Sequence, residues 1–175
     1  MKKDTKLSHN LAAQFIYQLS LSLIPFISTP YLSRVLGSSM IGRFSYARSI
    51  ASYFVLAADF GSATYGQRLI ASLESDPGAQ KQALFDLVCL RIITAGLGGI
   101  VYLAAVVPAS VDPGVSFFAG LEILSVAVDI SWYYQGCERF SVIAVSNGIT
   151  KLVMILLLFA FVRKSADVWI YAAIY

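Results

Sequence analysis

Charged side chains are scarce in this sequence: they make up 13% of its 175 residues, whereas 58% of the residues are hydrophobic. Soluble domains carry about 25% charged residues. Because a domain of this size must expose much of its surface, so many apolar side chains cannot all be buried in a core surrounded by water. The deficit therefore excludes an ordinary soluble domain and indicates a lipid environment. The formal net charge is only +3, so we expect no nucleic acid partner.

Residues that carry catalysis or bind metals are also few, since there are two cysteines and one histidine. Cys89 lies in an apolar run and Cys137 in a short loop, which predicts neither a disulfide framework nor a metal site. His9 has no ligand-type partner nearby. The sequence contains no nucleophile–base pair, metal-ligand cluster or phosphate-binding glycine loop. This argues against an enzyme and predicts neither a cofactor nor a metal.

Long apolar runs separated by short polar turns are abundant instead. A helix needs about 20 apolar residues to cross the hydrocarbon core, and five runs reach that length. We therefore expect an all-α, polytopic bundle of transmembrane helices. The predicted spans are 10–36, 40–60, 83–107, 114–134 and 141–162. A sixth run covers 168–175 and ends after about 12 Å of helix, which predicts that the sequence is a fragment of a longer chain.

Two segments are expected to depart from regular spans. Pro25 and Pro30 interrupt the first apolar run, so its helix should bend or break midway. Residues 61–82 are more polar and carry apolar side chains at helical spacing, which is typical of an amphipathic helix at the membrane surface. The Asp-Pro-Gly sequence at 76–78 is expected to end that helix.

Basic residues indicate the orientation, because short loops rich in Lys and Arg remain in the cytoplasm. With the N-terminus inside, the inner segments carry six basic residues and the outer segments four, so we expect a cytoplasmic N-terminus. The inner residues are Lys2, Lys3, Lys6, Arg68, Lys81 and Arg139, and the outer ones are Arg34, Arg43, Arg163 and Lys164.

Some ionisable side chains lie within the apolar runs and are candidate functional residues. A charge at the bilayer centre costs about 2.5–3.5 kcal/mol, so such a side chain should face the bundle interior or a water-filled cavity. At 100° per residue, Arg48 and Asp59 lie nearly on one line, with Ser45 and Ser52 beside it. The whole set consists of Arg48, Asp59, Asp86, Arg91, Glu122, Asp129 and Lys151.

Each of these charges also has a structural interpretation. Arg48 and Lys151 lie deep in their spans, which favours a cavity over a buried ion pair, although an acidic residue of the fourth span could pair with Lys151. For Arg91 and Glu122 the two interpretations stay open. The aspartates lie toward span ends, where their side chains can reach the lipid headgroups.

Several stretches carry motifs that are familiar in this order. They are TPYLSRVLG at 29–37, IGRFSYA at 41–47, SYFV at 52–55 with DFG at 59–61, DISWYYQG at 129–136, and Asn147 with Lys151. In these stretches, and over nearly the whole chain, the sequence resembles the polysaccharide transporter family. This family comprises the Wzx-type flippases of O-antigen, lipopolysaccharide and capsule synthesis. It belongs to the MOP superfamily, together with the MATE exporters and the lipid II flippases.

The resemblance implies a fold and an activity. The fold would be part of the N-terminal lobe of a MATE-like (MOP) transporter, and the chain would hold less than one of the two lobes. Family members move an oligosaccharide repeat unit, attached to undecaprenyl pyrophosphate, across the bacterial inner membrane by alternating access. The implied partners are this lipid-linked oligosaccharide and membrane lipid, together with a polysaccharide polymerase and a chain-length regulator.

Residue type suggests roles within that activity, because the arginine fork matches phosphate oxygens. As cavity residues that bind the pyrophosphate or the glycan we expect Arg34, Arg48, Arg91 and Lys151. For gating or ion coupling we expect Asp59, Glu122 and Asp129.

Three other functions remain as alternatives. A MATE-type exporter of drugs or organic cations would favour acids in its cavity, whereas Arg48 and Lys151 favour an anionic cargo. A membrane-embedded glycan polymerase or acyltransferase would need a large loop with catalytic residues, and the loops expected here are short. In a purely structural membrane subunit, the buried charges would serve only helix assembly.

Overall fold

The computed structural model describes residue 26 and residues 28–174, and these are helical nearly throughout, with no strand among them. The predicted all-α class is therefore confirmed for the described part of the chain. Residues 28–35 are helical. The helices that follow are α2 (Gly37–Asp59), α3 (Ser62–Ser72), α4 (Pro77–Val101), the π-helical η1 (Tyr102–Val106), α5 (Val107–Ala109), α6 (Pro113–Val128), α7 (Ser131–Gly136), α8 (Phe140–Phe161), the 3₁₀-helical η2 (Ser165–Asp167) and α9 (Val168–Ile174).

Three helical stretches of the described residues are long and apolar enough to cross a membrane. They are Pro77–Ala109, Pro113–Gly136 and Phe140–Phe161. Large apolar side chains on them point outward, such as Ile100 at 66% and Leu156 at 61% exposure, which suits a surface covered by lipid. The polytopic helical membrane bundle expected from the sequence is thus confirmed. The first predicted span, 10–36, lies mostly outside the described residues, so the count of five crossings stays a prediction.

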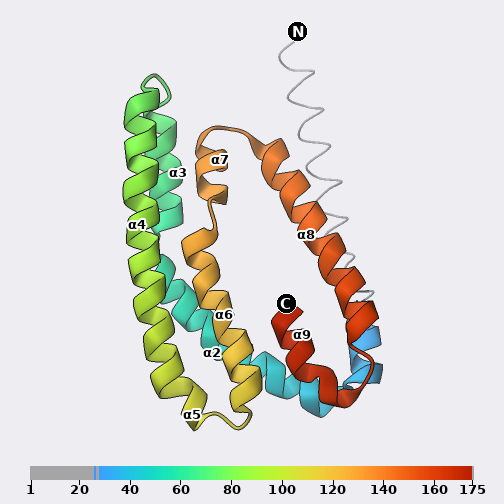
Figure 1. Cartoon of the computed structure of the whole chain (residues 1–175). Helices are drawn as coiled ribbons and strands as arrows, with labels where there is room; N and C mark the ends of the chain where they lie inside the picture. Colours follow the sequence, from blue (N-terminus) through green and yellow to red (C-terminus); the bar gives the residue numbers. More distant parts are fainter. Residues whose placement is uncertain (1–25, 27, 175) are drawn as a thin grey trace.

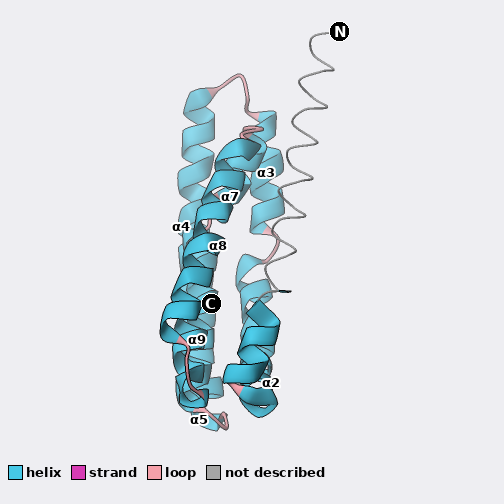
Figure 2. Ribbon diagram, turned by 90° about the vertical axis from the view of Figure 1, so that its right-hand side faces the viewer, coloured by secondary structure: helices cyan, strands magenta, loops and turns pink. Residues whose placement is uncertain are grey.

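The bundle is elongated, and its loops gather at two ends (Figure 1). The α3–α4 and α7–α8 connections lie at one end, and the α5–α6 and α8–α9 connections lie at the other. The main core forms where α2, α4 and α6 pack together and α9 packs on α2 and α6. Small buried residues such as Ala51, Ala95 and Ala119 let these helices approach closely. Figure 2 shows α2 and α3 on one side of the bundle.

A second, smaller core joins α3, α4 and α7, and its buried members are Ile70, Leu87 and Trp132. Its helices pack too closely for a side chain at two glycines. A Cβ at Gly66 would lie 2.5 Å from Cε3 of Trp132, and one at Gly136 would lie 2.8 Å from the carbonyl oxygen of Gln67. Residues 62–72 thus form a helix that packs against α4 and α7, and its predicted place at the membrane surface stays a prediction.

Three local features bear on the sequence-based expectations. Residues 28–35 are helical through Pro30, whereas Pro25 lies outside the described residues, so a bend midway in the first span stays a prediction. Asp76 begins α4 instead of only ending the previous helix, because its Oδ1 accepts from the N–H groups of Gly78 and Ala79 at 3.0 Å. Helix α6 ends at Val128, and α7 begins at Ser131, so the range 114–134 holds two helices.

Candidate functional site

Arg91 on α4 is the most buried charged side chain of the described residues, with 2% of it exposed. Its Nη1 donates to Asp59 Oδ1 at 2.7 Å and to Ser62 Oγ at 2.8 Å, and its Nε donates to the Val126 carbonyl oxygen at 2.8 Å. Its Nη2 lies 3.9 Å from Asp129 Oδ2. The guanidinium group therefore joins α4 to the ends of α2 and α6 and to the start of α3.

The local backbone explains why these partners meet. Phe60 and Gly61 have positive φ angles of 46° and 75°, so α2 ends there and the chain turns into α3. Helix α6 ends at Val128, which leaves its last carbonyl groups without partners inside the helix. Arg91 satisfies one of them, at Val126, and its positive charge is favourable at a helix C-terminus.

Asp129 also organises the chain that follows it. Its Oδ1 accepts a hydrogen bond from the backbone N–H of Ser131 at 2.9 Å and another from the Ser131 hydroxyl. Its carbonyl oxygen accepts from Trp132 Nε1 at 3.1 Å. These contacts stabilise the start of α7. The contacts of Arg91, Asp59 and Asp129 therefore favour a structural role, in which the charges hold the helices together. Arg91 also lines neither the groove that contains Lys151 nor the other hollows described for this chain.

Arg48 on α2 faces Glu122 on α6. Its Nη2 donates to Oε1 and its Nε lies beside Oε2, both at 3.4 Å, and the two side chains are 40% and 31% exposed. The pair lies where α2 and α6 pack together, so α2 presents its cation to an interhelical space and not to lipid.

Arg48 and Lys151 line one groove of about 530 Å³. We call it the cationic groove. Its walls come from residues 28–32, α2, α8 and α9, and no acidic side chain is among its lining residues in the described part of the chain. Its lining consists of Ser28, Thr29, Leu32, Ile41, Phe44, Ser45, Arg48, Ser49, Ser52, Lys151, Met154, Leu158 and Tyr171.

The cationic groove brings together residues that the sequence had placed on one stripe, since Ser45, Arg48 and Ser52 all line it. Ser49 was missed, although it follows Arg48 directly and lies one turn from Ser45 and Ser52. Lys151 has no carboxylate within 4.0 Å among the described residues, because Glu122 pairs with Arg48 and Asp129 lies near Arg91. The groove thus combines two cations with hydroxyl groups.

A second hollow, of about 350 Å³, also has Arg48 among its lining residues. We call it the Glu122 hollow, and it lies between α2, α6 and α9. Arg48 therefore reaches both spaces, with its carboxylate partner in only one of them. The lining residues are Phe44, Arg48, Phe118, Ala119, Leu121, Glu122, Ser125, Ala172 and Ala173.

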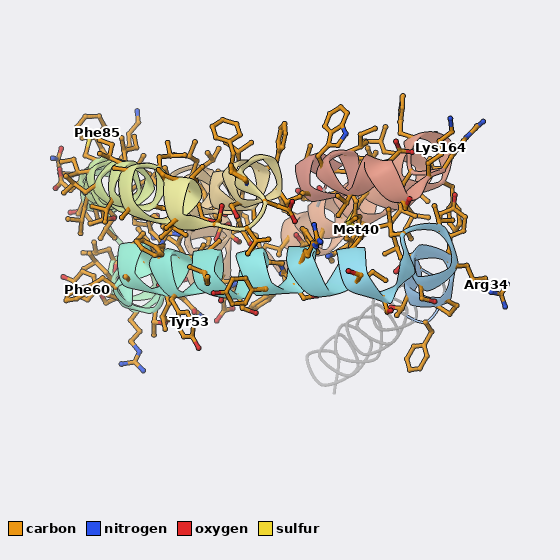
Figure 3. All side chains as sticks on the ribbon, turned by 90° about the horizontal axis from the view of Figure 1, so that it is seen from below. Arg34, Met40, Tyr53, Phe60, Phe85 and Lys164 are labelled. Atoms are coloured by element: carbon orange, nitrogen blue, oxygen red, sulfur yellow. The ribbon has the colours of Figure 1, made fainter. Side chains whose placement is uncertain are left out.

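The remaining predicted cation, Arg34, is exposed and projects from the edge of the bundle in Figure 3. It lines neither of these spaces. The sequence did not single out the pair of Arg43 and Asp112, which joins α2 to the α5–α6 loop at 3.1 Å beside a hollow of about 430 Å³. Both side chains lie near predicted turns, where a charge needs no buried partner.

The arrangement favours binding of an anion over covalent chemistry. The described residues contain no group of His, Cys, Asp and Glu side chains that could hold a metal ion. A guanidinium group and serine hydroxyls from α2, with an ammonium group from α8, match the acceptor oxygens of phosphate or sugar groups.

Known proteins are similar to this chain over most of its length. A family model described as polysaccharide biosynthesis protein matches residues 7–175. A protein of Escherichia coli (strain K12), named as a candidate O-antigen transporter, is 24% identical over 167 residues, which cover 93% of this chain and 40% of that protein. The chain thus spans 40% of the length of this relative. No solved structure shows a significant match.

Proposed function

Because the chain belongs to the polysaccharide biosynthesis protein family, we propose that it forms part of a flippase for lipid-linked oligosaccharides in the bacterial inner membrane. The resemblance that its motifs indicated is thereby confirmed at the level of the family. The proposed cargo is an oligosaccharide repeat unit on undecaprenyl pyrophosphate, and the proposed partners are this lipid and the surrounding membrane, with a polysaccharide polymerase and a chain-length regulator acting on the product.

The cationic groove is the observation that carries the proposal. A pyrophosphate group and a glycan do not cross hydrocarbon unaided, because their charges and hydroxyl groups would lose water without gaining partners. Arg48 on α2 and Lys151 on α8 offer cations, and Ser45, Ser49 and Ser52 offer hydroxyl groups from α2. An arginine fork binds phosphate oxygens in pairs, whereas the lysine ammonium acts as a point charge.

The groove offers a binding place for the polar head group of the cargo, and the lipid tail does not need to enter it. In the proposed mechanism the head group binds in the groove while the undecaprenyl chain stays among the lipid tails. Rocking of the helices then exposes the bound head group to the other side by alternating access. With the N-terminus in the cytoplasm, the α3–α4 and α7–α8 connections would face the cytoplasm, since they share one end of the bundle (Figure 1).

The contacts support the predicted site residues unequally. Arg48 and Lys151 line the groove, so they are the proposed ligands of the pyrophosphate. For Arg34 and Arg91 a substrate role stays a prediction without a contact that supports it. Gating or ion coupling by Asp59, Glu122 and Asp129 also stays a prediction.

Replacement of Arg48 tests the proposal. In the intact protein, Arg48→Ala should lower export of the polysaccharide about tenfold or more, because a hydrogen bond to a charged group contributes about 1.5–3 kcal/mol. Membrane insertion should be unchanged. The measurement is surface polysaccharide in a bacterial strain that lacks its own flippase and carries the variant, together with the amount of protein in the membrane fraction.

Arg68→Ala is the matched control, because Arg68 is an exposed arginine on α3 that lies outside the cationic groove. It removes the same charge and should leave export at the wild-type level. Normal surface polysaccharide with Arg48→Ala would contradict the proposed role of the groove.

A cation exporter of the MATE type is disfavoured by the same groove. Two cations on its walls, and no carboxylate among its described lining residues, would repel a cationic drug. A purely structural role of the charges fits Arg91, because protein acceptors bind its N–H groups. Such a role does not explain Lys151, which has no carboxylate partner among the described residues.

A further inference from the structure

Arg48 lines two hollows of opposite character. The cationic groove contains Lys151 and hydroxyl groups, whereas the Glu122 hollow contains a carboxylate. Both environments adjoin the same side chain. The same guanidinium group can therefore face an anion of the protein on one side or an anion of the cargo on the other.

Distances show that the carboxylate partner of Arg48 is held loosely. The buried pair of Arg91 and Asp59 has an N–O distance of 2.7 Å, whereas both contacts of Arg48 with Glu122 measure 3.4 Å. Strong charge-assisted hydrogen bonds measure about 2.7–2.9 Å. The Arg48 and Glu122 side chains are also 40% and 31% exposed, so the protein does not enclose the pair as it encloses Arg91. Such a pair is strong enough to occupy Arg48 and weak enough to be exchanged.

We propose that Glu122 is a specificity-determining residue, which occupies Arg48 while the cationic groove is empty and yields only to an anion that engages Arg48 and Lys151 together. This inference rests on the proposed function. The preferred ligand class is a pyrophosphate group, whose separate negative charges meet both cations. A group with one negative charge is satisfied at Lys151 alone and leaves Arg48 with Glu122.

The membrane itself makes this discrimination necessary. Anionic phospholipids carry a phosphate diester with one negative charge, and they surround the protein in large excess over any lipid-linked oligosaccharide. A groove with two uncompensated cations would bind these headgroups and stay filled. Glu122 reduces the effective positive charge of the groove for a single-charged anion, because binding at Arg48 first requires the carboxylate to be displaced. Specificity therefore arises from an internal competitor as well as from attractive contacts.

The same competitor favours release of the cargo. A ligand that binds too tightly in the groove would remain there after the protein has opened to the other side. When Glu122 returns to Arg48, it replaces one of the contacts of the pyrophosphate and lowers the cost of its departure. Glu122 thus acts through Arg48 and touches the cargo at no stage.

Binding of two small anions to the purified intact protein tests the inference. The probes are inorganic pyrophosphate and dimethyl phosphate, which carries one negative charge as a phospholipid diester does. Glu122→Gln should raise the affinity for dimethyl phosphate about fivefold, as expected for removal of a partly exposed ion pair. The ratio between the two affinities should fall, because the competitor no longer penalises the weaker anion. Isothermal calorimetry of wild type and variant gives both constants.

Asp112→Asn is the matched control, because Asp112 belongs to another exposed ion pair, with Arg43, and lines neither the cationic groove nor the Glu122 hollow. It should leave both affinities unchanged. A double substitution isolates the coupling: in an Arg48→Gln background, Glu122→Gln should have no further effect on either anion. If Glu122→Gln does not fold, Glu122→Asp keeps the charge, draws it back by one methylene group, and should raise the affinity for dimethyl phosphate to a smaller extent.

The outcomes separate the inference from the function on which it rests. Wild-type binding of pyrophosphate that depends on Arg48, with equal affinities in wild type and Glu122→Gln, would overturn the role of Glu122 and leave the proposed function intact. Loss of discrimination in both Glu122→Gln and Asp112→Asn would also overturn it, because a general change of charge would then be the cause. Absence of any Arg48-dependent binding of pyrophosphate would overturn the proposed function together with this inference.

Discussion

Arg91 shows at the scale of single residues how a charge becomes tolerable in an apolar helix. Its side chain is 2% exposed, and its partners come from α2, α3, α6 and the turn after α6. A buried ion pair contributes little net stability compared with well-packed apolar residues, but removal of one partner leaves the other charge without compensation. The cost of losing Arg91 is therefore set by Asp59 and Asp129, which would remain.

We expect Arg91→Leu to destabilise the intact protein by about 3–5 kcal/mol, because it leaves Asp59 in a partly buried position without its cation. Thermal unfolding of the purified protein in detergent measures the change. Addition of Asp59→Asn should recover part of the loss, since it removes the orphaned charge. Arg68→Leu on the exposed face of α3 should shift the transition by much less. Equal unfolding temperatures for Arg91→Leu and Arg68→Leu would contradict the structural role of Arg91.

Sequence reasoning identified the charges but not their partners. The cost of charge in lipid singled out Arg48, Arg91 and Lys151, and it did so without any knowledge of contacts. Their partners could not be predicted, because Glu122 lies 74 residues from Arg48 in the chain and only the packing of α2 on α6 brings them together. The alternatives for Lys151 stayed open for the same reason.

At the scale of elements, two helix interruptions lie at the same level of the bundle. The chain turns after α2 at Phe60 and Gly61, and it turns after α6 at Asp129 and Ile130. Arg91 contacts Asp59 and Asp129, which adjoin these turns, so one side chain stabilises both. Beyond this level α3 and α7 form the smaller core with α4, and their approach depends on Gly66 and Gly136.

The close packing of α3 on α7 gives a test at this scale. Gly136→Ala should destabilise the protein by about 1–3 kcal/mol, because the added Cβ would lie 2.8 Å from the carbonyl oxygen of Gln67 and from the Ile70 side chain. Gly96→Ala is the matched control, since nothing lies within 4 Å of its added Cβ. In a helix interior this exchange is neutral or stabilising. Thermal unfolding of both variants measures the difference. A lower unfolding temperature for Gly96→Ala than for Gly136→Ala would contradict the packing of α3 on α7.

Apolar runs indicate helices most directly where lipid is the main neighbour. The predicted ranges 83–107 and 141–162 lie within or almost within the helical stretches Pro77–Ala109 and Phe140–Phe161, and their role as membrane crossings stays a prediction. The break at Asp129 and the packing of α3 against α7 could not be predicted in this way. Both depend on neighbours distant in the chain, namely Arg91 for the first and Trp132 for the second.

At the scale of the whole molecule, the two ends of the bundle should face opposite sides of the membrane. In a variant of the intact protein without its native cysteines, Ser110→Cys should react with a thiol reagent that cannot cross the inner membrane, when the reagent is added from outside. Ser75→Cys should react only after the membrane has been opened. Ser110 follows α5, and Ser75 lies in the α3–α4 connection at the other end (Figure 1). Labelling of Ser75→Cys in sealed cells, with Ser110→Cys protected, would reverse the expected orientation.

The contacts of Arg91 also constrain the order in which the protein can be built. During synthesis α2, which ends at Asp59, is made before α4, and Val126 and Asp129 are made after α4. When α4 leaves the translocon, Arg91 therefore has only its earlier partners, Asp59 and Ser62, and its remaining donors are satisfied once α6 arrives. Association of α2 with α4 before α6 emerges would give Arg91 a carboxylate partner early, and α6 would then complete the neutralisation of its charge.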